Sequence, residues 1–321
     1  MKYHISFLSF RRMIRLKGKK GMETEQRKKA VFHLPGLFEF YGLYSRFLPL
    51  YEKHREYFYD WCTIGSLYGA PAGCLWSGGR CGEGHADPRA VLDLCEQYGI
   101  SARLTFSNSL LKEEHLSDPV CSRLCQLFDD GHDNGVIVHS DLLLQYLKEK
   151  YPSLYFVSST TKVLLNFDAF HRELERPAFR YTVIDFRLNK AFEKLFSLSR
   201  KEKEKTEFLC NECCYFGCKD RKRCYEAVSQ EVLGIETDFH CSAPGSEEGY
   251  VFSKAMENPG FISVEDIQNI YLPAGFTNFK IEGRSLGSAV VLEFLLYYLV
   301  RPSCRLKVRE AVYLTSTLDL F

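Results

Sequence analysis

The chain has 321 residues, of which 45% are hydrophobic and 26% are charged, and its net charge is +1. These values are typical of a globular protein with a full hydrophobic core, and they exclude a generally basic surface that coats nucleic acid. The length suits one large domain, since an α/β barrel needs about 250 residues.

The positive charge is concentrated at the amino terminus. Residues 1–29 hold ten Lys or Arg and two Glu, a local balance of +8, so the remaining chain carries about −7. We expect a disordered basic leader or an upstream start codon with Met22 opening the chain, and the alternative is an RNA-binding arm. The apolar stretch 5–10 is interrupted by Arg11 and Arg12 and lacks a signal cleavage site. The apolar stretch 289–300 is too short to span a bilayer, so we expect a cytoplasmic protein with no membrane partner.

Short β-rich runs alternate with longer amphipathic stretches along the rest of the chain. One such helix is expected over 87–98, with Asp87 as its N-cap and Pro88 in its first turn, and another over 142–150. Eight strands are expected, at 30–34, 63–68, 101–106, 135–139, 154–157, 181–186, 207–210 and 278–282. This alternation predicts parallel βαβ units and, with eight of them, a (β/α)8 barrel of the TIM type over residues 30–321. A doubly wound open sheet is the alternative.

One connection is much longer than the others. Residues 211–277, between the seventh and eighth strands, greatly exceed a normal βα loop, so we expect a functional insertion there. It opens with a dense group of cysteines, since five of the thirteen cysteines in the chain lie within residues 210–224.

Clustered thiols in a reducing compartment indicate a metal site, because thiolates are soft ligands that one turn can direct at a single centre. We predict four ligands in a C-x2-C-x4-C-x5-C pattern, with Cys74, Cys214 and Cys241 in reserve. The predicted ligands are Cys210, Cys213, Cys218 and Cys224. Zinc and an iron–sulfur cluster both suit such a set, and a regulatory disulfide or unligated thiols are the alternatives.

The last strand carries charges where a barrel normally has apolar side chains. Residues two apart on a strand share a face, so Lys280, Glu282 and Arg284 are expected to point into the barrel together. Buried charges must pair or bind a polar group. The trio therefore predicts an anion-recognising or acid/base site, or else a structural network of ion pairs.

The stretch from Asp266 to Arg284, which ends in PAGFTNFKIEGR, resembles the C-terminal signature of the collagenase-like peptidase family. That family includes the ubiquinone-hydroxylation proteins UbiU and UbiV and proteins that hydroxylate RNA. The resemblance implies a barrel-like core, a [4Fe–4S] cluster on four cysteines, and Lys280, Glu282 and Arg284 as the matching site residues. It favours iron–sulfur over zinc.

The sequence leaves three functions open. The first is an iron–sulfur enzyme that modifies a small molecule or an RNA base, for example by hydroxylation without oxygen. The second is a peptidase of the collagenase-like type, for which the sequence offers no HExxH motif. The third is a non-catalytic binding protein in which zinc stabilises the long insertion.

Overall fold

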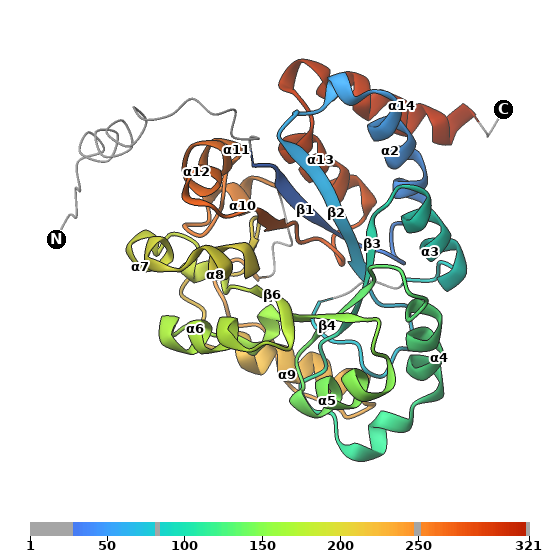
Figure 1. Cartoon of the computed structure of the whole chain (residues 1–321), viewed down its shortest axis with the longest axis vertical. Coiled ribbons are helices and arrows are strands. Elements are labelled where there is room, and N and C mark those ends of the chain that lie inside the picture. Colours follow the sequence, from blue (N-terminus) through green and yellow to red (C-terminus); the bar gives the residue numbers. More distant parts are fainter. Residues whose placement is uncertain (1–27, 81–83, 247–251, 319–321) are drawn as a thin grey trace.

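The structure, a computed structural model, describes residues 28–80, 84–246 and 252–318. Eight parallel strands close into a barrel in chain order, and helices surround it (Figure 1). Closure is direct, because β1 pairs with β2 on one side and with β8 on the other, where Val31 lies opposite Asn278. The predicted (β/α)8 barrel is confirmed. The predicted leader falls outside the described residues, apart from residues 28 and 29.

All eight predicted strands are present, most of them within one or two residues of the expected bounds. The strands are β1 (Ala30–Pro35), β2 (Cys62–Gly69), β3 (Ser101–Phe106), β4 (Gly135–Val138), β5 (Tyr155–Ser158), β6 (Phe179–Val183), β7 (Thr206–Leu209) and β8 (Asn278–Lys280). The helices are α2 (Tyr41–Lys53), α3 (Pro88–Gln97), α4 (Pro119–Phe128), α5 (Asp141–Lys150), α6 (Phe167–Glu175), α7 (Phe192–Ser197), α8 (Arg200–Lys205), α9 (Arg221–Val232), α10 (Phe252–Glu257), α11 (Val264–Asp266), α12 (Leu272–Ala274), α13 (Ser288–Leu299) and α14 (Arg305–Leu318).

Local sequence explains where these helices begin. Asp87 accepts a hydrogen bond from the backbone N–H of Ala90 and so caps α3, with Pro88 in the first turn as predicted. Asp118 caps α4 in the same way, and Ser140 caps α5. In the part of the chain that the structure describes, no helix is both long and apolar enough to cross a membrane.

Two apolar regions lie on the two sides of the strands. The larger one fills the space between the strands and the helices and holds most of the buried aliphatic and aromatic side chains. The smaller one lies inside the barrel and is built around Tyr68, Ile137, Val157, Val183 and Leu209. Because strand residues alternate between the two sides, a polar residue in register with the smaller cluster points into the barrel.

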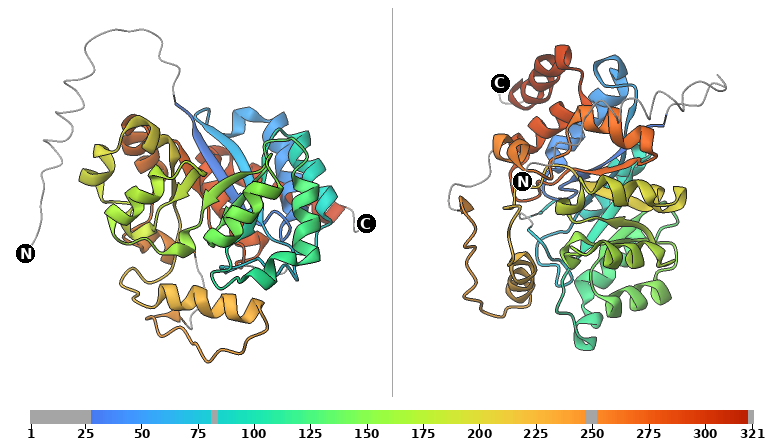
Figure 2. Two further views of the ribbon diagram at one scale, coloured as in Figure 1. Left: turned by 60° about the horizontal axis from the view of Figure 1, so that its bottom comes forward. Right: turned by 90° about the vertical axis from the view of Figure 1, so that its left-hand side faces the viewer.

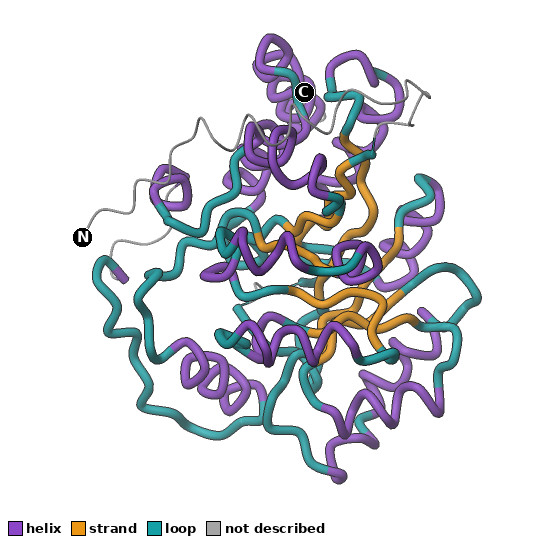
Figure 3. The backbone as a smooth tube through the Cα atoms, turned by 60° about the vertical axis from the view of Figure 1, so that its left-hand side comes forward, coloured by secondary structure: helices purple, strands orange, loops and turns teal. Residues whose placement is uncertain are grey.

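The long insertion leaves the barrel at the carboxyl end of β7 and returns at β8. It contains α9 to α12, and α9 lies across one end of the barrel with a long loop beside it (Figure 2). The tube view shows this loop as a wide arc outside the helical ring (Figure 3). The insertion thus covers the end of the barrel at which functional groups of this fold gather.

Candidate functional site

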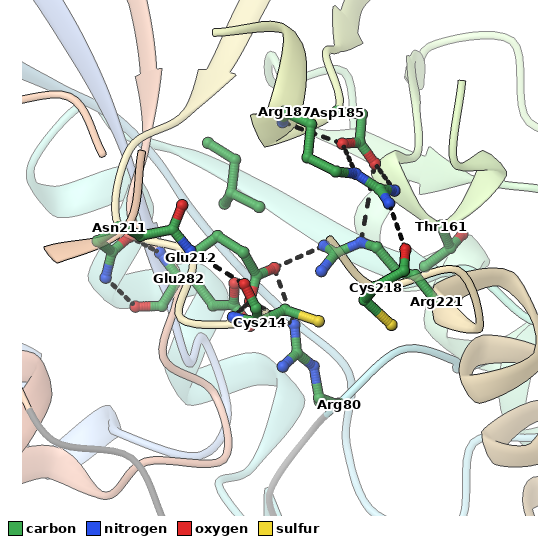
Figure 4. Close-up of polar contacts among 12 residues, drawn as sticks. Arg80, Thr161, Asp185, Arg187, Asn211, Glu212, Cys214, Cys218, Arg221 and Glu282 are labelled. Carbon is green, nitrogen blue, oxygen red and sulfur yellow. Dashed lines mark hydrogen bonds and ion pairs between the residues drawn. The ribbon is translucent and has the colours of Figure 1, made fainter. Parts of the chain in front are cut away.

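A chain of ion pairs crosses the carboxyl ends of β2, β6 and β7 (Figure 4). Glu212, just beyond β7, accepts hydrogen bonds from Arg80 Nη2 at 2.8 Å and from Arg221 Nη2 at 2.5 Å. Arg221, in the first turn of α9, lies with its Nε 3.8 Å from Asp185 Oδ2, and Arg187 Nε donates to Asp185 Oδ1 at 2.8 Å. Because Glu212, Arg221 and Asp185 are buried, these pairs are shielded from water and tie the insertion to the barrel.

Glu282 forms the other end of this chain. Its Oε1 lies 2.9 Å from Arg80 Nη2, and its backbone is clamped by Asn211, which accepts from the Glu282 N–H at 2.7 Å and donates to its carbonyl at 3.0 Å. Burial raises the pKa of Glu282 to about 8 against the pull of Arg80, and repulsion from Glu212 adds to the rise. For Glu212, burial alone would raise the pKa, but Arg221 and Arg80 hold it well below its ordinary value. The two carboxyl groups therefore differ in protonation near neutral pH, which suits an acid beside a fixed carboxylate.

The three charged residues of the last strand converge as the sequence predicts. Lys280, Glu282 and Arg284 all line one small pocket of about 50 Å³ at the mouth of the barrel, here called the mouth pocket. Only Lys280 belongs to β8, because the strand ends there and the other two lie in the loop that follows. Arg284 Nη2 donates to the carbonyl of Gly78 at 3.1 Å. Gly79 has φ +72° and would place a Cβ 3.3 Å from that guanidinium, so a glycine suits this approach.

Deeper in the barrel lies a second group of charges that sequence reasoning missed. Glu207 accepts from Arg103 Nη1 at 2.7 Å, and its carboxylate lies 3.5 Å from both Lys280 Nζ and His33 Nε2. Arg103 Nε also donates to Tyr155 OH at 2.7 Å. Burial would raise the pKa of Glu207, but the surrounding cationic groups lower it to about 2. The signal was present in the sequence, because Arg103 and Glu207 stand within otherwise apolar or neutral strands.

Five cysteines share one large cavity beside the mouth pocket. The cavity measures about 1100 Å³ and is walled by the start of α9, the loop before it and the loop that ends near residue 246. The cysteines that line it are Cys213, Cys214, Cys218, Cys224 and Cys241. Arg80 and Tyr225 line both this cavity and the mouth pocket, so the two spaces are neighbours.

The remaining predicted ligand, Cys210, lies elsewhere. It is fully buried in the apolar core between strands and helices, and its Sγ contacts the carbonyl of Phe208 at 3.6 Å. Cys74, held in reserve, is also buried, with its Sγ 3.2 Å from that of Cys121. The structure thus brings together three of the four predicted cysteines, and adds Cys214 and Cys241 to them.

Three thiols of this cavity, those of Cys213, Cys214 and Cys224, have raised pKa values and so favour the neutral form. Burial raises the pKa of Cys213 and Cys224, and raises that of Cys214 to about 11 against the pull of Arg221. Among the described residues, no three His, Cys, Asp or Glu side chains are gathered closely enough to hold a metal ion. The donor set fits a thiolate-held centre in number and chemistry, and binding one would release protons and draw the thiols together.

No protein-family model matches the chain, and no curated protein matches it. Among solved structures it is similar to the U32 peptidase Mk0906, a member of the collagenase-like family. The identity is 14%, the TM-score is 0.47, and the match covers 82% of this chain and 97% of the other. A likeness at this level carries no conclusion about activity, and the predicted kinship with UbiU and UbiV stays a prediction.

Proposed function

We propose that this protein is an enzyme whose cysteine-lined cavity holds an iron–sulfur cluster and whose mouth pocket binds the substrate. The observation that supports this most is the common wall of the two spaces, since Arg80 and Tyr225 line both. A substrate group held at the mouth would therefore lie next to a centre held by the cysteines. The expected substrate is a small molecule or an RNA base.

The set of ligands that the cavity supports differs by one residue from the set predicted from the cysteine spacing. Cys218, Cys224 and Cys241 line the cavity from three different segments, and the adjacent pair Cys213 and Cys214 supplies a fourth thiol. Cys241 takes the place of Cys210 in this proposal, because Cys210 belongs to the apolar core. A cluster bound there would supply electron transfer beside the mouth pocket.

The side chains around the cavity have separate tasks in this proposal. Arg80 and Arg221 offset the negative charge that bound thiolates bring, since both oppose the rise that burial causes in the pKa of Cys214. Glu282, whose pKa burial raises to about 8, holds its proton beside the Glu212 carboxylate, and its Oε2 has no hydrogen-bond partner. Glu212 stays ionised and fixes Arg80 in position between the two spaces. This arrangement suits proton donation to a substrate oxygen as the reaction proceeds.

Anaerobic purification followed by an absorption spectrum and iron, sulfide and zinc analysis tests the proposal. We expect a broad band at about 400 nm and about four irons per chain in the wild type. Cys218→Ala and Cys241→Ala should lose them, whereas Cys210→Ala and the matched control Cys304→Ala should keep them. One zinc and no colour would replace this function with a zinc-stabilised binding protein, and no metal at all would refute both.

An RNA substrate is distinguished from a small molecule by salt. Binding to RNA should weaken steeply as the salt concentration rises, because phosphate contacts release counterions. Lys222 and Arg223, exposed beside the cavity in α9, are the described residues expected to contribute most. Saturable binding that salt leaves nearly unchanged would favour a small neutral substrate.

A further inference from the structure

Buried polar atoms without partners gather at the mouth pocket. Across the described residues, eleven buried side-chain nitrogen and oxygen atoms have no hydrogen-bond partner. Four of them belong to residues that line this one pocket of about 50 Å³, namely Thr105 Oγ1, Thr160 Oγ1, Glu282 Oε2 and Arg284 Nη1. Buried polar groups are normally satisfied, so a group of unsatisfied ones around a cavity indicates that something polar fills it.

Arg284 dominates the chemistry of the pocket. Its side chain is 8% exposed, and only its Nη2 is held, by the carbonyl of Gly78 at 3.1 Å. Among the described residues this guanidinium forms no ion pair, and its charge only opposes, from a greater distance, the rise that burial causes in the pKa of Glu39. A buried charge that lacks an ion pair is costly, and a bound anion would remove the cost. The ring of Tyr68, 5.9 Å from the guanidinium carbon, covers one side of it but supplies no negative charge.

Lys280 adds a second donor from the barrel side of the same pocket. Its side chain is buried, and its contact with the Glu207 carboxylate, at 3.5 Å, is long for an ion pair. The shorter contact of that carboxylate, at 2.7 Å, goes to Arg103. Nζ also lies 3.5 Å from the centre of the Tyr68 ring, so of its three hydrogens at most one remains for a ligand in the pocket.

The size of the pocket limits what enters it. One water-sized probe needs about 10–15 Å³, so a pocket of about 50 Å³ has room for about three to five non-hydrogen atoms. That is the size of a carboxylate or phosphate group and is too small for a ring. The donors around it, the guanidinium of Arg284, the amino group of Lys280 and two hydroxyls, are those that bind anionic oxygens.

We propose that the mouth pocket is an oxyanion subsite that takes the carboxylate or phosphate group of the substrate, with Arg284 as its principal ligand. Thr105 and Thr160 donate their hydroxyl hydrogens to the anion. The rest of the ligand extends past Arg80 into the cysteine-lined cavity, and in this respect the subsite rests on the proposed function. Anion binding itself requires no metal.

Titration calorimetry on the anaerobically purified full chain tests the subsite. Inorganic phosphate and acetate are titrated separately, in buffer whose ionic strength is kept constant with chloride. We expect saturable binding of one of them at a single site per chain, and the anion that binds identifies the class of group. In Arg284→Gln the affinity should fall at least about tenfold, and in Arg284→Lys it should fall less, because the charge is kept while the fork of donors is lost.

Two further variants make the result specific. Arg309→Gln removes an arginine that pairs with Glu293 on the protein surface, and it should bind the anion as the wild type does. Thr160→Val keeps the volume, removes one hydroxyl and should weaken binding about three- to tenfold. The Thr160→Val variant also tests the subsite if Arg284→Gln does not fold.

Two results would overturn the subsite. One is that neither phosphate nor acetate binds saturably to the wild type. The other is that Arg284→Gln or Thr160→Val, properly folded, binds as tightly as the wild type. Metal content measured on the same samples separates this result from the proposed function. Anion binding without iron would leave the subsite standing and remove the redox proposal, and iron without anion binding would do the reverse.

Discussion

The barrel contains two layers of buried charge that differ in how well they are satisfied. In the inner layer, the Glu207 carboxylate contacts Arg103 at 2.7 Å, and Lys280 and His33 at 3.5 Å. His33 is itself held by Ser66 Oγ at 2.8 Å. In the outer layer, at the mouth, Arg284 and Glu282 each keep a buried polar atom without a partner. The layers are adjacent and share Lys280, which contacts the inner layer and lines the mouth pocket.

This difference separates structural charge from charge that is ready for a ligand. A carboxylate with several cationic partners stabilises the closed barrel, since each strand end is pinned to another across the interior. A guanidinium held on one side only is costly in the empty protein and gains when an anion arrives. Both layers place charged residues on or just beyond barrel strands, so the sequence does not distinguish them, and the hydrogen-bond partners that the structure shows do.

The largest expected effect comes from breaking the inner layer. Glu207→Gln leaves the Arg103 guanidinium buried without its counter-charge, so the free energy of unfolding should fall by about 3–5 kcal/mol. Chemical denaturation at pH 7 measures this. The matched control is Glu293→Gln, which breaks a half-exposed pair with Arg309 and should change the free energy by less than about 1 kcal/mol. Equal effects of the two substitutions would show that the inner layer is no more structural than a surface pair.

Most of the fold could be predicted from sequence because each strand is a short apolar run between polar turns. The largest error was at β6, expected over 181–186 and found at Phe179–Val183. Ile184 and Phe186 continue the apolar pattern, but Asp185 accepts a hydrogen bond from the backbone N–H of Arg187 and turns the chain away from the sheet. A hydrogen bond between a side chain and the backbone two residues further on thus ends β6, although the hydrophobic pattern continues beyond it.

The site could be predicted only where local periodicity applied. Strand alternation predicts a common direction for Lys280, Glu282 and Arg284, and the three line one pocket, although only Lys280 lies on β8. Alternation also bears on Cys210, since Glu207 and Leu209 point into the barrel and the residues between and beyond them point out. The prediction of Cys210 as a metal ligand followed the spacing between the cysteines and not this alternation.

No short sequence pattern indicates the ion pairs at the mouth of the barrel. Arg80 and Glu212 are 132 positions apart, and their contact exists because the barrel brings the ends of β2 and β7 around to one opening. Cys241 likewise lines the same cavity as Cys224, although the rest of α9 and a loop separate the two residues in the sequence. Long-range closure of this kind is set by topology rather than by any short pattern.

The second prediction concerns Lys280, the residue that both layers share. Burial lowers its pKa from 10.5 to about 7, with Glu207 opposing and Arg103 and Arg284 adding to the shift. Between pH 7 and 10.5 the unfolded chain therefore binds a proton that the folded chain does not, so stability rises with pH across this window. Lys280→Met should remove that rise, which for one proton is at most about 1.4 kcal/mol per pH unit.

Denaturation curves of wild type and Lys280→Met at pH 7, 8 and 9 measure the difference in slope. Below pH 7 the lysine is protonated in both states, so no further change from this group is expected there. Lys53→Met, an exposed lysine in the last turn of α2, is the control and should follow the wild-type profile. Parallel profiles for Lys280→Met and the wild type would mean that this lysine stays charged when buried and belongs wholly to the inner layer.

The smallest expected effect on stability comes from removing single buried hydroxyl groups. Thr105 and Thr206 are both buried threonines on barrel strands, but Thr206 Oγ1 donates to the carbonyl of Glu202 at 2.8 Å, whereas Thr105 Oγ1 has no partner and faces the mouth pocket. Thr206→Val should lower the free energy of unfolding by about 1 kcal/mol, because a satisfied hydrogen bond is lost. Thr105→Val should leave it unchanged or raise it by up to about 1 kcal/mol, because an unsatisfied hydroxyl is removed.

The same pair then separates folding from binding. With the bound anion in excess, the wild type and Thr206→Val should both gain stability, by an amount set by the anion concentration relative to its dissociation constant. Thr105→Val should gain less, because its hydroxyl no longer donates to the anion. If Thr105→Val were destabilised as much as Thr206→Val without anion and gained as much with it, the Thr105 hydroxyl would be satisfied in the free protein. The distinction between the two layers would then not extend to the threonines of the mouth.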